Sequence, residues 1–398
     1  MKPLINRYSY FTFYWSVLLC SVFPVILGLG YVDEFMAFSV FGVMLLYHLK
    51  NKKQIPLPVK LYFLFVVFYF VYSLLLSLNV ISALLFDVIQ QSKPFVAFWG
   101  VFYLYPSFSL PKQFSLRRLS IIVSVIIVGV IIVLGRENAI MFFTGHESGY
   151  GGLCLLIAIV YYYCSKRNKN NLIVFFTILG LGLLSGKAKF YGEFCVALYL
   201  FFLCKKKIKV SIKNIVSGTL LIMIIILATS EKFDLYFGSA ARNEGDGIAR
   251  VVLYLRSFDV LSDYFPLGSG FGTYASYASS KYYSQLYYRY GMNSVYGLEP
   301  DPQYGNFVAD TYYPSIIGEF GLPGCLLLIC FWMTIFKKIN CNLDYNRNMD
   351  DYRISMLLVT TFLIEGIAGP LLLANVGVPI MMLLGLILCN SRLKQIAN

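Results

Sequence analysis

Residues 309–336 read ADTYYPSIIGEFGLPGCLLLICFWMTIF and join a polar, breaker-rich segment to an uncharged apolar one. The first part carries two acids, Asp310 and Glu319, and ends in Gly321-Leu322-Pro323-Gly324. The second part is apolar enough to enter a membrane as a helix. Because proline and glycine break or kink helices, the sequence predicts a membrane helix whose entry is kinked near Glu319.

The composition of the whole chain indicates an integral membrane protein. Of its 398 residues, 58% are hydrophobic and only 13% are charged, and the mean hydropathy is +0.69. A single soluble core cannot bury that much apolar surface, whereas a helix of about 20 apolar residues crosses a bilayer. The predicted fold is all-α, a polytopic transmembrane helical bundle of about 12 spans, at residues 10–30, 34–49, 60–81, 84–106, 119–135, 149–165, 171–185, 190–204, 214–230, 313–336, 354–370 and 372–390.

Basic residues concentrate in alternate connections and predict the orientation. They lie in the short loops 51–54, 111–118, 165–171, 205–209 and 337–353 and in the tail 392–395. Cytoplasmic loops carry such an excess of Lys and Arg, so both termini are predicted to be cytoplasmic in a bacterial inner membrane. The net charge of +13 is then a consequence of the membrane topology. It forms no single basic patch, which argues against nucleic-acid binding.

The predicted organisation has three parts. Residues 1–230 form the first nine spans, 231–312 form one large extracytoplasmic loop with short helices, and 313–398 form the last three spans and a cytoplasmic tail. The loop is dense in tyrosine, whereas disordered segments are poor in aromatic residues. No disulfide framework, metal-ligand spacing or cofactor motif is present, so no metal and no cofactor are expected.

Several charged residues fall at the predicted outer face, where ionisable groups are often functional. Lys187 and Lys189 lie in one turn, and Arg250 and Arg256 lie in the loop; guanidinium and ammonium groups bind phosphate. Each could instead be an interfacial anchor. Asp310 could cap a helix instead of accepting a proton. Three further candidates have structural alternatives: Glu319 could pair with a cation, Lys93 could pair with Asp87, and His146 could be a surface histidine without a role.

The order of four short elements resembles the O-antigen polymerase and ligase superfamily. These are the turn SGKAK (185–189), Arg250 in RVVLY, the turn PLGSGFGTY (266–274), and ADTYYPSIIGEFGLPG (309–324). The resemblance covers most of residues 180–330 in detail. It implies a multispanning bacterial glycosyltransferase that acts without a metal at the periplasmic face.

The resemblance also implies a reaction and roles for individual residues. An O-antigen polymerase transfers a glycan from undecaprenyl pyrophosphate to a new carrier-linked repeat unit. Its partners would be that lipid-linked glycan, membrane lipid, a chain-length regulator and a flippase. The implied roles are general base for Asp310, Glu319 or His146; pyrophosphate binding for Lys187, Lys189, Arg250, Arg256, Lys93 and Arg136; and glycan binding for Tyr274, Tyr312 and Tyr313.

Two alternatives remain open from the sequence. Ligases of the superfamily typically carry His where this chain has Asp310, and Arg where it has Lys187 or Lys189, which favours a polymerase over a ligase that acts on lipid A-core. A lipid-linked oligosaccharide flippase or other transporter also fits about twelve spans. The chain has no internal repeat, and its single large loop makes the two halves unlike.

Overall fold

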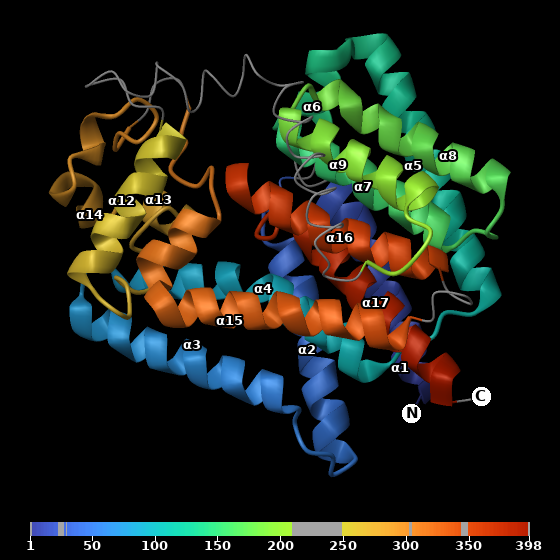
Figure 1. Cartoon of the computed structure of the whole chain (residues 1–398), viewed down its shortest axis with the longest axis horizontal. Coiled ribbons are helices and arrows are strands. Elements are labelled where there is room, and N and C mark those ends of the chain that lie inside the picture. Colours follow the sequence, from blue (N-terminus) through green and yellow to red (C-terminus); the bar gives the residue numbers. More distant parts are fainter. Residues whose placement is uncertain are drawn as a thin grey trace.

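The computed structural model describes residues 2–22, 28, 30–208, 249–301, 305–343 and 349–396, and no strand occurs in these ranges. Helices form the regular structure throughout (Figure 1). In the first half they are α1 (Lys2–Val17), η1 (Leu18–Val22), α2 (Val32–Lys50), α3 (Leu57–Leu76), α4 (Ile81–Leu104), α5 (Leu110–Leu134), α6 (Arg136–Thr144), α7 (Glu147–Tyr163), α8 (Lys169–Leu181), η2 (Gly182–Ser185), α9 (Ala188–Leu198) and η3 (Tyr199–Leu203). In the second half they are α12 (Ala249–Asp263), α13 (Tyr277–Lys281), α14 (Gln285–Arg289), η5 (Met292–Ser294), α15 (Tyr313–Asn342), α16 (Met349–Ala368) and α17 (Gly377–Ile396).

Helices coincide, at least in part, with every predicted span except 214–230, which lies outside the described residues. Within the described ranges, α2, α3, α5 and residues Tyr313–Cys341 of α15 are long and apolar enough to cross a membrane. These helices support the coarse prediction of an all-α membrane protein. The number of crossings and their direction stay predictions.

The bundle is built around three helices that are buried over most of their described length, α4, α7 and α17. α4 packs against α2 and α17, and α7 packs against α5 and α8. In Figure 1, α15 runs in front of α4 with α3 below it, and α12, α13 and α14 gather at one end of this group. We call this end of α3, α4 and α15 the loop end.

The tyrosine-rich loop has a hydrophobic core of its own, as its composition predicts. Leu253 and Val260 of α12 are fully buried in that core. Tyr287 of α14 is fully buried with them, and its hydroxyl accepts a hydrogen bond from the backbone N–H of Ala275 at 2.8 Å. The described part of the loop is therefore a small packed unit on the loop end.

The predicted kink in α15 is confirmed at Gly321, where φ is 53° and ψ is −146°. Only glycine adopts this region at low cost. A Cβ atom on Gly321 would also collide with the backbone carbonyl of Pro266. That carbonyl accepts a hydrogen bond from the N–H of Leu322 at 3.0 Å, so the first residue after the kink bonds to the loop and not to its own helix.

The glycine-rich turn, residues 266–274, satisfies the carbonyl groups that the kink releases. The backbone N–H groups of Ser269 and Gly270 donate to the carbonyls of residues 318 and 319, both at 2.8 Å. The Tyr69 hydroxyl of α3 donates to the carbonyl of residue 320 at 2.7 Å. A buried carbonyl without a partner is costly, so the turn and the kink stabilise each other.

The turn can approach this closely because Gly268 has no side chain. Its φ is +78°, and a Cβ atom there would lie 2.6 Å from the carbonyl oxygen of Gly318. The breaker-rich segments on the two sides of this contact are therefore complementary parts of one interface.

We expect Gly321→Ala to destabilise the protein, because it places a Cβ atom in a glycine-only backbone conformation and against the turn. The expected loss is about 1–3 kcal/mol from the backbone alone, with a further loss from the collision. Thermal unfolding of the purified protein in detergent measures it.

Gly129→Ala is the matched control, because a Cβ atom on Gly129 of α5 meets nothing within 4 Å. Equal melting temperatures for the two variants would contradict the interface described above.

Candidate functional site

Two buried acids bind the backbone of the glycine-rich turn. One carboxylate oxygen of Glu319 accepts hydrogen bonds from the N–H groups of Thr273 at 2.9 Å and Tyr274 at 3.0 Å. The carboxylate of Asp87 in α4 accepts one from the N–H of Gly272 at 2.9 Å. The hydroxyl of Ser276 donates to the same oxygen of Glu319 at 2.8 Å. The two acids therefore hold the turn to α4 and α15.

This geometry argues against two of the predicted roles. Glu319 is 0% exposed and is used as an anchor for the turn, so it is poorly placed to take a proton from a substrate. The alternative prediction for Glu319 is an ion pair with a cation, but backbone N–H groups bind its carboxylate instead. Tyr274 is fully buried in the loop core, and its hydroxyl donates to the carbonyl of Leu253 at 2.6 Å. Its ring is not available to stack on a sugar.

Asp310 forms an ion pair with Arg250 of α12. A guanidinium nitrogen of Arg250 lies 2.8 Å from a carboxylate oxygen of Asp310, and about a quarter of each side chain is exposed (26% and 25%). Asp310 does not cap α15, whose N-cap is Tyr312 without a side-chain cap bond. Of the three candidate bases, Asp310 thus lies beside a predicted phosphate ligand and within reach of solvent.

His146 and Lys187 lie near this pair. Burial first, and then the charge of Lys187, lower the pKa of His146, while the charge of Asp310 acts in the opposite direction. The ring nitrogen Nδ1 of His146 accepts a hydrogen bond from the backbone N–H of Ser148 at 3.2 Å and so caps α7. These effects favour the neutral form of His146, and the second nitrogen of its ring lies outside the cap.

Lys187 carries a carboxylate partner of its own. Its ammonium group lies 2.6 Å from Glu147, and that hydrogen bond lowers the pKa of the Glu147 carboxyl group. Both side chains are more than a third exposed, so solvent screens the pair and its contribution to stability is small. A ligand phosphate could therefore compete for Lys187.

The remaining cations of this region also have defined places. Nε of Arg136 donates to the carbonyl of Leu184 at 2.6 Å, just before the turn that holds Lys187. Lys189 forms an ion pair with Glu365 of α16 at 2.5 Å. We call these side chains the polar cluster: Arg136, His146, Lys187, Lys189, Arg250 and Asp310.

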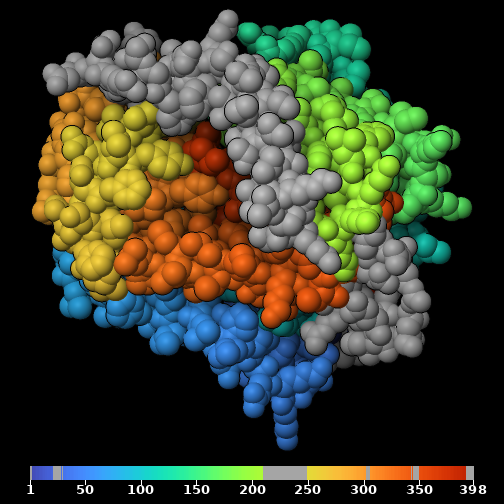
Figure 2. Space-filling model, viewed as in Figure 1, coloured from blue at the N-terminus to red at the C-terminus, as the bar shows by residue number. Residues whose placement is uncertain are grey.

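The C-terminal end of α16 joins the polar cluster to the loop. Its carbonyl groups at residues 366, 367 and 368 accept hydrogen bonds from the Tyr312 N–H at 3.1 Å, the Tyr254 hydroxyl at 2.9 Å and the Lys189 ammonium at 3.2 Å. The Tyr313 hydroxyl donates to the carbonyl of residue 363 at 2.8 Å. Figure 2 shows a hollow beside the yellow α12 and above the orange α15, with red C-terminal residues visible at its base.

Two predicted phosphate ligands lie apart from the polar cluster. Arg256 forms an exposed ion pair with Asp259 on its own helix at 2.8 Å. Lys93 is buried and pairs with Asp33 at 2.5 Å and Glu34 at 3.0 Å, not with Asp87. An ammonium group held by two carboxylates is poorly suited to a pyrophosphate.

The positions of Tyr312 and Tyr313 do not support the predicted glycan contacts of these two residues. The Tyr312 ring is 3% exposed and lines an apolar groove. The Tyr313 hydroxyl is used by α16, as described above. Both tyrosines join helices to one another.

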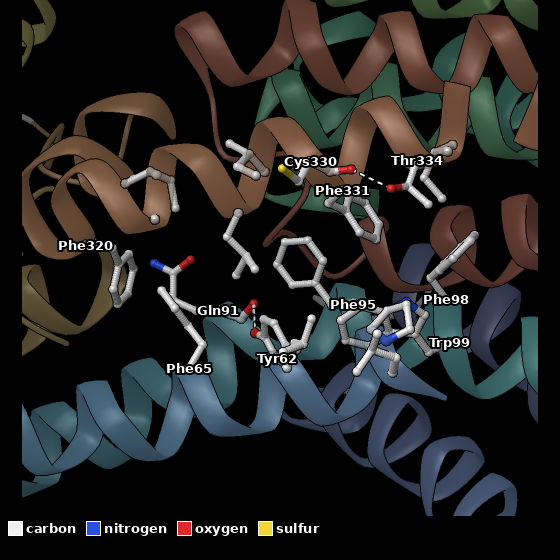
Figure 3. Close-up of a pocket in the computed structure, with 18 of the residues that line it drawn as sticks. Tyr62, Phe65, Gln91, Phe95, Phe98, Trp99, Phe320, Cys330, Phe331 and Thr334 are labelled. Atoms are coloured by element: carbon white, nitrogen blue, oxygen red, sulfur yellow. Dashed lines mark hydrogen bonds between the residues drawn. The ribbon is translucent and has the colours of Figure 1, made fainter. Parts of the chain in front are cut away.

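That apolar groove runs between α3 and α15 over α4 and has a volume of about 250 Å³. Figure 3 shows Tyr62 of α3 and Phe95 and Trp99 of α4 opposite Phe331 of α15. At the loop end it includes Phe271 of the glycine-rich turn. Several neighbouring residues of α3 are exposed and apolar, so the groove borders the surface that faces lipid.

Several buried charged groups were not identified from the sequence. Glu193 of α9 is buried against Glu365, and Asp33 and Glu34 at the start of α2 bind Lys93. Their signal was their position inside or at the edge of apolar spans, where a charge needs a partner. No local pattern identifies that partner, because it lies on another helix.

Comparison with known proteins adds no family assignment. No protein-family model matches the chain, and no curated protein matches it. The site is therefore interpreted from its own geometry.

We expect Glu319→Ala to unfold or strongly destabilise the protein, since it leaves three donors of the turn without their acceptor. Each buried donor without a partner costs about 1–3 kcal/mol. Glu319→Gln keeps an acceptor oxygen and should retain most of the stability. Thermal unfolding and expression level in membranes measure both.

Asp310→Asn is the control variant. The carboxylate of Asp310 is partly exposed, so this variant should unfold at a temperature close to that of the wild type. If Glu319→Ala were as stable as Asp310→Asn, the anchoring role of Glu319 would be wrong.

Proposed function

We propose that this protein polymerises lipid-pyrophosphate-linked oligosaccharide repeat units into O-antigen or a related surface polysaccharide. The observation that carries the proposal is the polar cluster. It brings together cations from three separate segments of the chain: Arg250 lies beside Asp310, Lys187 and Lys189 lie near His146, and Arg136 lies near Glu147. A site that transfers a glycan from a pyrophosphate needs fixed cations and a base close together.

The chemistry assigns one step to each group. The acceptor hydroxyl oxygen attacks the anomeric carbon of the donor sugar, and the bond from that carbon to the pyrophosphate oxygen breaks. The electron pair of that bond goes to the leaving pyrophosphate, where Arg250 and Lys187 would stabilise the added charge. The proton of the acceptor hydroxyl goes to the carboxylate of Asp310.

The ion pairs of the polar cluster suit this sequence of events. Arg250 is held by Asp310 before substrate binds, and Lys187 is held by Glu147. A pyrophosphate carries more charge than one carboxylate and would draw both cations away from their partners. Asp310, released from Arg250, would then be a stronger base.

The groove between α3 and α15 would accommodate part of the isoprenoid chain of the carrier. Its lining is apolar and aromatic, and it ends at the glycine-rich turn. The charge distribution of the loops supports an outer-face location for the polar cluster in the inner membrane, in a topology of about twelve spans with both termini cytoplasmic. A carrier lipid in the outer leaflet would reach the groove from the side.

Deletion of the gene in its own host, followed by electrophoresis of the surface polysaccharide, tests this function. Deletion should reduce the ladder to core plus a single repeat unit. Wild type should restore the ladder, whereas Asp310→Asn and Arg250→Ala should not, and Arg250→Lys should restore it poorly because lysine lacks the bidentate geometry.

Arg289→Ala is the matched control, since Arg289 forms an exposed pair with Asp263 in the same loop; it should restore the full ladder. Loss of even the single repeat, with long chains on the carrier, would indicate a ligase. An unchanged ladder after deletion would remove polysaccharide assembly as the function and favour a transporter.

A further inference from the structure

A second cavity, of about 400 Å³, lies between the loop and the bundle. Its volume is within the range of about 300–1,000 Å³ that is usual for ligand cavities. We call it the loop cavity. Residues of α4, α13 and the turn between α16 and α17 line it: Phe86, Gln90, Lys93, Tyr277, Ser280, Lys281, Leu373, Ala374 and Asn375.

The floor of the loop cavity is a buried polar network. Glu34 accepts hydrogen bonds from the amide of Gln90 at 2.5 Å and the ammonium of Lys93 at 3.0 Å. Lys93 also lies 2.5 Å from Asp33. An ammonium group has three N–H donors, so two carboxylates leave it one for a ligand. The network fixes both side chains without using all their hydrogen-bonding capacity.

The charges around the loop cavity disfavour an anion. Two carboxylates, Asp33 and Glu34, accompany Lys93. The other cation, Lys281, lies over the ring of Phe86 at 5.0 Å. Asp33 and Glu34 offset the charge of Lys93, so the buried ammonium group offers little net attraction to a phosphate.

Its uncharged lining suits a sugar ring. The hydroxyl groups of Tyr277 and Ser280 and the amides of Gln90 and Asn375 both donate and accept hydrogen bonds. Phe86 supplies an aromatic ring, on which the C–H face of a pyranose can pack. The ordinary pKa of tyrosine is about 10, so the hydroxyl of Tyr277 keeps its proton at pH 7 and can donate it in a hydrogen bond.

The segment 305–310 connects the loop cavity to the proposed base. The side-chain amide of Asn306 donates a hydrogen bond to the hydroxyl of Ser280 in the cavity wall at 2.7 Å, and the backbone N–H of Asp310 donates to the carbonyl of Phe307 at 3.1 Å. Asp310 therefore ends a short segment that is bonded to the cavity wall, and it pairs with Arg250 of the polar cluster. A hydroxyl of a sugar bound in the cavity would be near the carboxylate that must take its proton.

From this arrangement we infer that the loop cavity binds the acceptor sugar, the terminal sugar of the repeat unit that receives the growing chain. This inference rests on the proposed function and assigns the two substrates to different places. The donor pyrophosphate binds the polar cluster, and the acceptor sugar binds between α4, α13 and the turn before α17.

Ser280→Trp fills the loop cavity and tests the inference by binding. The full-length protein is purified in lipid nanodiscs, and the probe is the repeat-unit oligosaccharide released by mild acid from the carrier lipid of the host. Ser280→Trp should weaken oligosaccharide binding about ten-fold or more, which is the loss expected from one or more hydrogen bonds. Binding of inorganic pyrophosphate, the second probe, should not change.

Two further variants guard against misfolding. Asn375→Leu removes one amide at similar volume and should weaken oligosaccharide binding in the same direction. Ser294→Trp places the same large side chain at an exposed position of the loop and should bind both probes as wild type does. Wild-type binding by both Ser280→Trp and Asn375→Leu would overturn the inference, as would a wild-type protein that does not bind the oligosaccharide. Loss of pyrophosphate binding in Ser280→Trp would overturn it in favour of an anion site.

The ladder of surface polysaccharide separates this inference from the proposed function. If deletion of the gene leaves the ladder intact, the proposed function fails. If the ladder depends on the gene and Ser280→Trp supports a normal ladder, only the assignment of the acceptor sugar fails.

Discussion

The mutual satisfaction of backbone groups between the glycine-rich turn and the kinked α15 is the constraint on which the loop end depends. A kink releases carbonyl groups inside a bundle where water is scarce, and each needs a donor. The turn supplies backbone N–H groups from residues 269 and 270, and Glu319 and Asp87 in return accept the N–H groups that follow. Without this exchange neither segment could keep its conformation.

The same exchange orders the parts above it. The turn continues directly into α13, which carries Tyr277 and Ser280 toward the loop cavity. On its other side it follows α12, which carries Arg250. The contact between the turn and α15 therefore determines two positions. One is that of Arg250 beside Asp310, and the other is that of the polar wall opposite Lys93.

Local features could be predicted from the sequence because their causes are local. The apolar runs locate the helices, the breakers at 321–324 locate the kink, and the tyrosines of 249–312 indicate a packed loop. The partners of buried charges could not be predicted, because they are fixed by contacts between distant segments. Lys93 pairs with Asp33 and Glu34 on α2 instead of with Asp87 on its own helix. Glu319 accepts hydrogen bonds from backbone N–H groups instead of pairing with a cation. Asp310 and Arg250 were both predicted as site residues, but that they pair with each other was not.

The described part of the loop has its own hydrophobic core, and one short turn bonds it to buried acids of the bundle. In such an arrangement, sequence constraints on the turn differ from those on the rest of the loop. Residues 266–276 are restricted by the backbone they must bind, whereas the segment around α13 and α14 can change its surface while its core is kept. Related chains could then diversify by exchange of that segment, and a chimaera that joins this bundle to another loop at residue 276 would inherit a new preference without a new fold.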